Sequence, residues 1–223
     1  MQRLPEPELM DDVAQVTAYA HADFEDAHRT IVAQFGRVFG EDERPNTLLD
    51  LGCGPADISI RFARLYPECK IDAVDGAPAM LRQAQVLLEQ AALQHQVTLH
   101  LQRLPDCELP EKSYEAIVSN SLLHHLHDPQ GLWLTIQRFA TPRTAIFICD
   151  LCRPQTVEQA QHLVSRYAAQ EPEILRHDFY NSLLAAFTPD EVEFQLDSAG
   201  LQGLKLEQIS DRHLLVHGRL QGR

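Results

Sequence analysis

Short apolar segments alternate with longer amphipathic ones between residues 47 and 149, and this alternation constrains the fold more than any other feature. The short segments favour strands because they are brief, apolar and bounded by glycine, proline or charged residues. The five expected strands are 47–51, 70–75, 97–101, 116–119 and 144–149, and the helices between them are 58–66, 78–93 and 129–139. Such alternation predicts an α/β fold, a doubly wound and mostly parallel sheet with helices on both faces.

The end of the chain breaks this alternation. Two further strands are expected at 204–209 and 213–216, with only Ser210, Asp211 and Arg212 between them. A link of this length permits an antiparallel hairpin but no crossover to a parallel neighbour. The sequence therefore predicts a seven-stranded sheet whose last strand is antiparallel to the rest.

We expect the whole chain to form a single domain, because 223 residues are enough to build one independent core. Helical periodicity covers 8–40 and, with a break at Pro172, 155–186. Thr188, followed three residues later by Glu191, predicts the start of a last helix. The expected parts are an N-terminal helical lid (1–44), a core (45–150), an inserted helical cap (153–186), and a final helix with the antiparallel strand pair (188–220).

Composition excludes several classes of partner. The chain has 19 Lys and Arg against 32 Asp and Glu, a formal net charge of -13, so it gains nothing from counterion release at phosphates. We therefore expect no nucleic-acid or membrane partner, and no apolar run reaches the roughly 18 residues that a membrane span needs. The N-terminus shows no apolar signal segment and the cysteines are irregularly spaced, so we expect reduced thiols in a cytoplasmic protein. The oligomeric state stays open.

A glycine-rich turn, in the segment LDLGCGPAD, follows the first expected strand. Gly52 and Gly54 let the backbone turn sharply and approach a ligand closely, and the next helix offers free N–H groups to an anion. Asp75 ends the second strand, where a carboxylate can accept both hydroxyls of a ribose. Asp57 stands where a dinucleotide-binding motif has its third glycine, which argues against NAD. Asp50 would repel a phosphate and attract an ammonium group, so the site suits a nucleoside that carries both a cation and a carboxylate.

Three segments together resemble the class I S-adenosylmethionine-dependent methyltransferases of the small-molecule type: DLGCGPAD, VDGAPAML and SYEAIVSNSLLHHLHDP. The resemblance covers roughly residues 45–150, and the reversed last strand agrees with the sheet of that family. It implies S-adenosyl-L-methionine as the cofactor and an in-line transfer of its methyl group to a small-molecule acceptor. Two alternatives stay open: a cofactor-binding subunit or sensor without activity, and a methyltransferase directed at a metal, a metalloid or a thiol.

The resemblance also implies the contacts of the cofactor. Gly52 and Gly54 would make room for its methionine part, with Asp50 near the amino group, and Asp75 would hold the ribose. The full expected set is Asp50, Gly52, Cys53, Gly54, Asp75, Gly76, Ala77, Met80, Leu104, Asn120 and Ser121.

Two positions depart from the pattern of the family. Ala56 replaces the third glycine of the usual run, a small change that the fold should tolerate. Arg103 stands where an acid usually meets the adenine amino group, which leaves the backbone of Leu104 or the side chain of Asp106 for this contact. Met80 fits the core of its helix as well as it fits the adenine wall.

A run of histidines follows the fourth expected strand, at the carboxyl edge where ligands bind in open α/β folds. His124 and His125 are our candidate catalytic residues, because an imidazole there can deprotonate or orient the acceptor. Packing or helix capping by one of them is the alternative. Cys149 and Cys152 end the fifth strand and could join the histidines in a metal site. Local spacing of this kind is a weak signal, so we expect no bound metal.

Contacts with the acceptor are expected from the helical segments outside the core. Tyr19 and Phe24 lie in the lid, and Arg153, Tyr180 and Asn181 lie in the inserted cap. These five residues form our candidate acceptor-binding set. For the cap residues, packing between two helices is the alternative interpretation.

Overall fold

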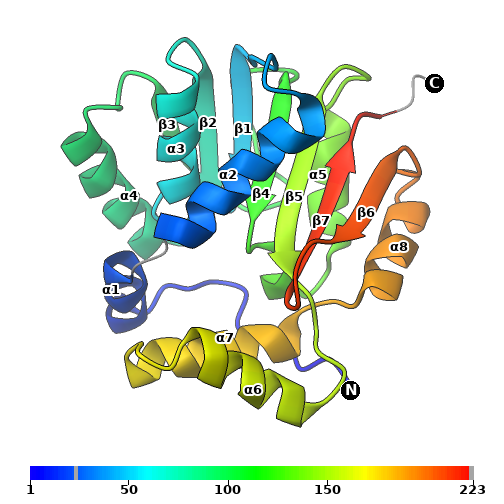
Figure 1. The fold of residues 1–223 in the computed structure, drawn as a ribbon. Coiled ribbons are helices and arrows are strands. Elements are labelled where there is room, and N and C mark those ends of the chain that lie inside the picture. The colour runs from blue at the N-terminus through cyan, green and yellow to red at the C-terminus, as the bar shows by residue number, and fades with distance from the viewer. Residues whose placement is uncertain (23–24, 221–223) are drawn as a thin grey trace.

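The strands expected from the apolar segments form one sheet in the computed structural model, which describes residues 1–22 and 25–220. The strand order is β3-β2-β1-β4-β5-β7-β6, and β7 runs antiparallel to both of its neighbours while the other strands share one direction. The strands are β1 (Thr47–Leu51), β2 (Lys70–Asp75), β3 (Val97–Leu101), β4 (Ala116–Asn120), β5 (Ala145–Leu151), β6 (Leu204–Gln208) and β7 (His213–Gly218). The predicted fold class is confirmed (Figure 1).

Helices cover both faces of the sheet, and a further helical layer lies below the carboxyl ends of the parallel strands (Figure 1). The core on one face contains residues of α2, α3 and α4, and the core on the other contains residues of α5 and α8. The helices are α1 (Val13–His21), α2 (Glu25–Phe39), α3 (Asp57–Leu65), α4 (Pro78–Ala91), the short 3-10 helix η1 (Leu123–His125), α5 (Gln130–Phe139), α6 (Val157–Tyr167), α7 (Glu173–Ala185) and α8 (Pro189–Ser198). In the described ranges, none of these is long and apolar enough to cross a membrane.

Strand β1 is apolar because helices cover it on both sides. Leu48 packs in the core that contains Phe35 of α2, whereas Leu49 and Leu51 pack in the core that contains Trp133 of α5. Each of these side chains is fully buried, and burial of one large apolar side chain contributes about 1.5–3 kcal/mol. This packing holds the carboxyl end of β1 in place. There the strand order reverses between β1 and β4, the place where open α/β sheets bind ligands.

The N-terminal segment differs from our expectation of one helical stretch over 8–40. Residues 1–12 form no helix, and we call them the N-terminal strap. Asp12 is the N-cap of α1 and accepts a hydrogen bond from the backbone N–H of Gln15, so the helix begins at Val13. Pro5 and Pro7 also exclude a helix from the first part of the strap, because each lacks a donor and disfavours helical geometry in the residue before it.

The strap is anchored beneath the sheet by Arg3. Its guanidinium donates hydrogen bonds to the backbone carbonyls of Ala185, His124 and Leu126 at 2.6–2.9 Å. The backbone N–H of Leu4 donates to another carbonyl of α7, at 3.0 Å. The strap therefore runs between the layer of α6 and α7 and the carboxyl ends of the strands (Figure 1).

The remaining helical expectations hold. The stretch predicted to break at Pro172 forms α6 and α7, and Pro172 is the N-cap of α7. Thr188 and Glu191 make the predicted capping box at the start of α8.

We expect Gly52→Ala to lower the free energy of unfolding by about 2 kcal/mol or more. Gly52 has a φ of +71°, and a Cβ there would lie 2.7 Å from Leu122 Cδ1 and 2.8 Å from Leu122 Cβ. The matched control is Gly36→Ala in α2, where a Cβ meets nothing within 4 Å. This control should raise stability by about 1 kcal/mol. Urea denaturation measures both, and equal effects would contradict the assignment of the turn.

Candidate functional site

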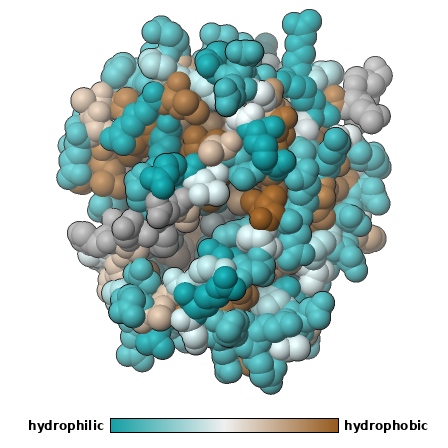
Figure 2. Space-filling model, in the orientation of Figure 1, coloured by the Kyte–Doolittle hydropathy of each residue, from teal (hydrophilic) through white to brown (hydrophobic). Residues whose placement is uncertain are grey.

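A cavity of about 540 Å³ lies at the carboxyl ends of β1, β2 and β4. The strap, α1 and α2, the loops after these strands, and α7 all contribute to its wall. The space-filling view shows this side of the molecule hollowed between the sheet layer above and the helical layer below (Figure 2). A cavity of this size fits a ligand as large as a nucleoside with an amino-acid tail.

The glycine-rich turn after β1 leaves its backbone open to this cavity. The N–H groups of Gly52 and Cys53 donate to the carbonyl of Val74 at 2.8 and 3.0 Å, which ties the turn to β2. A Cβ on Gly54 would meet only Met80 Sδ, at 4.0 Å, so the space beside it is free. Ala56, which replaces the family's third glycine, adopts a left-handed φ of 66° at the start of α3.

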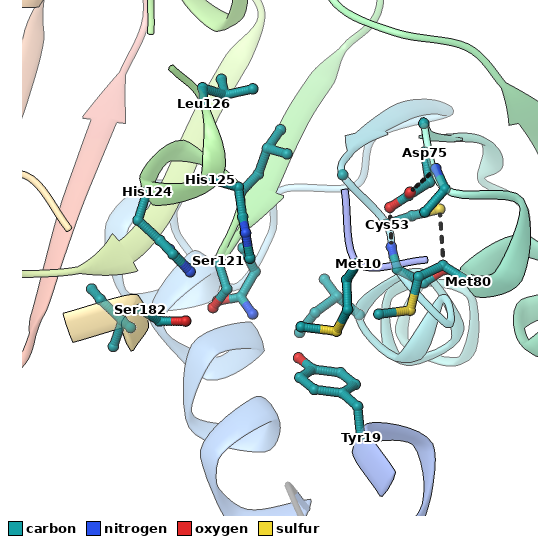
Figure 3. A pocket seen from close by; sticks show the side chains of 18 of the residues that line it. Met10, Tyr19, Cys53, Asp75, Met80, Ser121, His124, His125, Leu126 and Ser182 are labelled. Atoms are coloured by element: carbon teal, nitrogen blue, oxygen red, sulfur yellow. Dashed lines mark hydrogen bonds between the residues drawn. The ribbon is translucent and has the colours of Figure 1, made fainter. Parts of the chain in front are cut away.

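Asp75 links this turn to the end of β2. Its Oδ2 accepts a hydrogen bond from the N–H of Gly54, and its Oδ1 accepts one from the N–H of Ala77, both at 2.8 Å (Figure 3). Burial raises the pKa of Asp75, and these backbone hydrogen bonds oppose the rise. The carboxylate is therefore rigidly held at the cavity wall, and its remaining lone pairs can accept the hydroxyls of a ribose.

Asp50 lies deeper, at the end of β1. It is 1% exposed, and it accepts a hydrogen bond from Ser59 Oγ of α3 at 2.5 Å. Burial raises the pKa of Asp50 to about 7, and the hydrogen bond from Ser59 only partly opposes this rise. A buried carboxylate without a cationic partner is costly, so an ammonium group placed beside Asp50 would pair with it and favour its ionised form.

All eleven residues expected to contact the cofactor line this one cavity. Leu104 is among them, while Asp106, the alternative considered for the adenine contact, is not. Met80 is almost fully buried, in a small core cluster with Val16 of α1, and it also faces the cavity (Figure 3). Met80 therefore packs in the core of its helix, and its contact with the adenine stays a prediction.

The strap supplies wall residues that our sequence analysis missed. Glu8, Leu9 and Met10 line the cavity, and a Cβ on Gly76 would lie 2.9 Å from Leu9 Cδ2. Asp11 accepts a hydrogen bond from the N–H of Ala79 and so occupies the N-terminus of α4. The alternation of acids and prolines in the strap is the sequence signal for a non-helical segment. We did not use this signal because the period over 8–40 predicted a helix.

Helix η1 directs the two candidate catalytic histidines into the cavity from the side opposite Asp75 (Figure 3). His124 Nδ1 lies 2.6 Å from Asp150 Oδ1, and Asp150 Oδ2 accepts the N–H of Leu123 at 2.7 Å. Glu6 of the strap faces both rings, with its Oε1 3.5 Å from His124 Nε2 and 3.3 Å from His125 Nδ1. Asp150 and Glu6 were both missed by the sequence analysis.

The pKa values of the two histidines shift in opposite directions. Burial lowers the pKa of His124, but Asp150 and Glu6 outweigh this effect, so its pKa lies above the ordinary value. Burial and the neighbouring His124 lower the pKa of His125 to about 3, so this ring is neutral at neutral pH. Burial also raises the pKa of Glu6. The cluster thus places a neutral imidazole beside one that is held by a carboxylate.

The cysteines do not join this cluster. Cys149 packs in the core that contains α2 and α3, and Cys152 packs in the opposite core, because three residues along an extended chain reverse the side-chain direction. Burial raises the pKa of both thiols. In the ranges that the structure covers, the acidic or thiol side chain that approaches both histidines as a possible metal ligand is Glu6. The alternative of a mixed histidine and cysteine site is therefore wrong.

The five candidate acceptor-binding residues do not all line the cavity. Tyr19 lines the cavity (Figure 3), and burial raises the pKa of its hydroxyl to about 12. Phe24 lies outside the described residues. Arg153, Tyr180 and Asn181 are absent from the wall formed by the described chain, so the structure does not bring these three together with the other site residues.

Arg153 has a structural role instead. It is buried, and it donates to Glu191 of the capping box at 2.6 Å and to the carbonyl of Ala186 at 3.1 Å. It therefore holds the start of α8 against the end of β5. Tyr180 packs against a cluster that includes Leu163 of α6, which agrees with the alternative of a helix-packing seam.

Comparison with known proteins identifies the family. The sequence profile of a methyltransferase domain matches residues 43–200, more than half of the chain. The chain is a class I S-adenosylmethionine-dependent methyltransferase. An uncharacterized methyltransferase of Mycobacterium tuberculosis is 27% identical over 175 residues, which span 77% of this chain and 86% of the relative. A trans-aconitate 2-methyltransferase of Methylobacterium nodulans is 27% identical over 128 residues, 57% of this chain and 46% of that one.

Solved structures support the fold of this methyltransferase. A SAM-dependent methyltransferase from Aquifex aeolicus superimposes with a TM-score of 0.68 at 15% identity, over 94% of this chain and 99% of the other. The fit of the cofactor rests on the geometry described above: an open turn at Gly54, a carboxylate at Asp75 and a buried acid at Asp50. The methyltransferase thus uses S-adenosylmethionine as its cofactor.

We expect Asp75→Ala to weaken the binding of S-adenosylmethionine more than tenfold, because the two-hydroxyl contact of the ribose is lost. Asp75→Asn keeps one acceptor oxygen, and so one of the two backbone hydrogen bonds, but its NH2 group cannot accept the other and the charge is lost. It should weaken binding by a smaller factor than Asp75→Ala. Isothermal titration calorimetry measures both, with circular dichroism as a check of folding. Wild-type affinity in the folded Ala variant would contradict the ribose assignment.

Cofactor affinity should rise with pH between about pH 6 and about pH 8. The pKa of Asp50 is raised to about 7, so the carboxylate that pairs with an ammonium group is scarce below this pH and abundant above it. Binding near neutral pH should release a proton, which calorimetry detects as a dependence of the enthalpy on the buffer. Asp50→Asn should bind more weakly and lose this release. A wild-type affinity that falls with rising pH would contradict the assignment.

Proposed function

We propose that this methyltransferase transfers the methyl group to a small-molecule acceptor held between the histidine pair and α7. The observation that carries the proposal is the continuation of the cavity beyond the cofactor-binding turn, toward a pocket walled by η1 and the inserted cap. Leu175, Phe179 and Ser182 of α7 line this end, together with His213 at the start of β7. A cavity end lined by these side chains suits a small acceptor better than a polymer.

The net charge of the chain and the name of one relative also support a small-molecule acceptor. The net charge of -13 disfavours a nucleic-acid acceptor, and one relative is named for trans-aconitate, a small molecule. All five cysteines are free and buried, which supports a cytoplasmic site of action.

Catalysis in this proposal is mainly positioning. When bound, S-adenosylmethionine supplies a methyl group that leaves its sulfonium sulfur, with the bonding electron pair staying on sulfur. Asp50 and Asp75 hold the amino group and the ribose of the donor, and the strap and α7 exclude water from the space between donor and acceptor. His124 and His125 face this space, where they accept a proton from the acceptor or orient its attacking atom. Tyr19 closes the cavity from α1 (Figure 3).

The proposal is tested by incubating the protein with methyl-labelled S-adenosylmethionine and a small-molecule metabolite extract. Label is expected in an extract compound of low mass, and label confined to protein or RNA would contradict the small-molecule assignment. Heat released on titration with the cofactor but no labelled product of any kind would instead indicate a non-catalytic sensor.

With the acceptor known, His124→Gln should lower kcat about 100-fold while the cofactor Kd stays within about threefold. The reason is that His124 faces the acceptor end and lies opposite Asp75 in the cavity. Steady-state kinetics and calorimetry separate the two quantities. An unchanged kcat would remove the histidine from the reaction.

A further inference from the structure

Three side chains from two distant segments of the chain converge at the proposed acceptor end of the cavity. Glu6 comes from the strap, and His124 and His125 come from η1. One ligand atom of each, a carboxylate oxygen or a ring nitrogen, lies within 4.8 Å of the ligand atoms of the other two. Glu6 Oε1 is 3.5 Å from His124 Nε2 and 3.3 Å from His125 Nδ1.

These separations match those between ligands of one metal ion better than those of hydrogen bonds. Donors at about 2.0 Å from a tetrahedral zinc ion lie roughly 3.3 Å apart. Within the described part of the chain, His125 Nδ1 has no hydrogen-bond partner, although it is buried and close to Glu6. A buried ring nitrogen without a partner is uncommon, and a metal ion would supply the missing partner.

The surroundings of the histidines have the form of an outer coordination shell. The other ring nitrogen of His124, Nδ1, pairs with Asp150 at 2.6 Å, as in carboxylate–histidine–metal arrangements. Ser182 donates its hydroxyl to Glu6 at 3.0 Å and so orients the carboxylate. His124 and Glu6 are therefore each held in place by a second group.

The local charge also favours a cation. Asp150 and Asp178 join Glu6 among the acidic groups that act on this cluster, and the guanidinium of Arg3 acts against them. An ion bound by two histidines and one glutamate keeps an open coordination position, and the cavity lies beside both rings.

We propose that Glu6, His124 and His125 form a site for one divalent transition-metal ion, zinc in preference to magnesium. Imidazole ligands favour zinc and its neighbours, whereas magnesium prefers oxygen ligands. The open position would take an oxygen or thiol group of the acceptor and lower its pKa. This role toward the acceptor rests on the proposed function. With the metal ion bound, it replaces direct proton transfer from the acceptor to the histidines. Metal binding itself does not depend on the proposed function.

The test uses full-length protein without a histidine tag, dialysed against a chelator and titrated by calorimetry with zinc chloride and with magnesium chloride. Zinc should bind with a stoichiometry of one, and magnesium at least 100-fold more weakly. Glu6→Gln should weaken zinc binding at least 100-fold, and Asp150→Asn about 10- to 100-fold. The matched control is Glu207→Gln, which breaks a glutamate–histidine pair with His217 on the edge hairpin and should bind zinc like the wild type.

Titration of the same samples with the demethylated cofactor reports folding and the cofactor site independently. Zinc binding that is absent from the wild type, or equal in Glu6→Gln and Glu207→Gln, overturns the metal site. If the demethylated cofactor still binds in that case, the proposed function stands and only the metal site fails. If Glu6→Gln loses zinc and keeps the cofactor, the site is established as separate from the cofactor contacts.

Discussion

The site depends on the hydrogen bonds that join Asp75 to the turn after β1. One carboxylate accepts the N–H groups of Gly54 and Ala77, so it fixes the turn and the start of α4 at once. The same carboxylate lines the cavity, where we predict that it binds the sugar of the cofactor. Because the turn is also tied to β2 through Val74, donor binding requires little rearrangement of this part of the backbone.

The end of the cavity that we propose for the acceptor is built differently, by contacts between segments far apart in sequence. Arg3 joins the strap to η1 and α7, and Glu6 of the strap reaches the histidines. Asp150, at the end of β5, holds His124 from behind. The strap therefore belongs to the functional site as well as to its cover, and its loss would leave the histidines without one of their carboxylates.

Sequence patterns were sufficient where the physical cause is local. Alternating apolar segments predict the strands, and Thr188 and Glu191 predict a helix start. Every residue expected to contact the cofactor lines the cavity beside the turn at Gly52. Sequence patterns failed at Arg153, where long-range packing decides: Arg153 looked like a substrate ligand but pairs with Glu191, which is not encoded in neighbouring residues. In the strap, the period over 8–40 suggested a helix although Asp12 and the prolines were local signals against one.

The sequence alone determined the order of elements, the reversed last strand and the cofactor-binding turn, because strand pattern, link length and glycine placement act over a few residues. Only the tertiary structure decided which acids serve the histidines. Glu6 and Asp150 are separated from each other by most of the chain, and the strap and β5 bring them to opposite sides of one ring. The tertiary structure also places Cys149 and Cys152 in different cores. Side chains three residues apart on an extended chain point to opposite faces of the sheet, and each face has its own core.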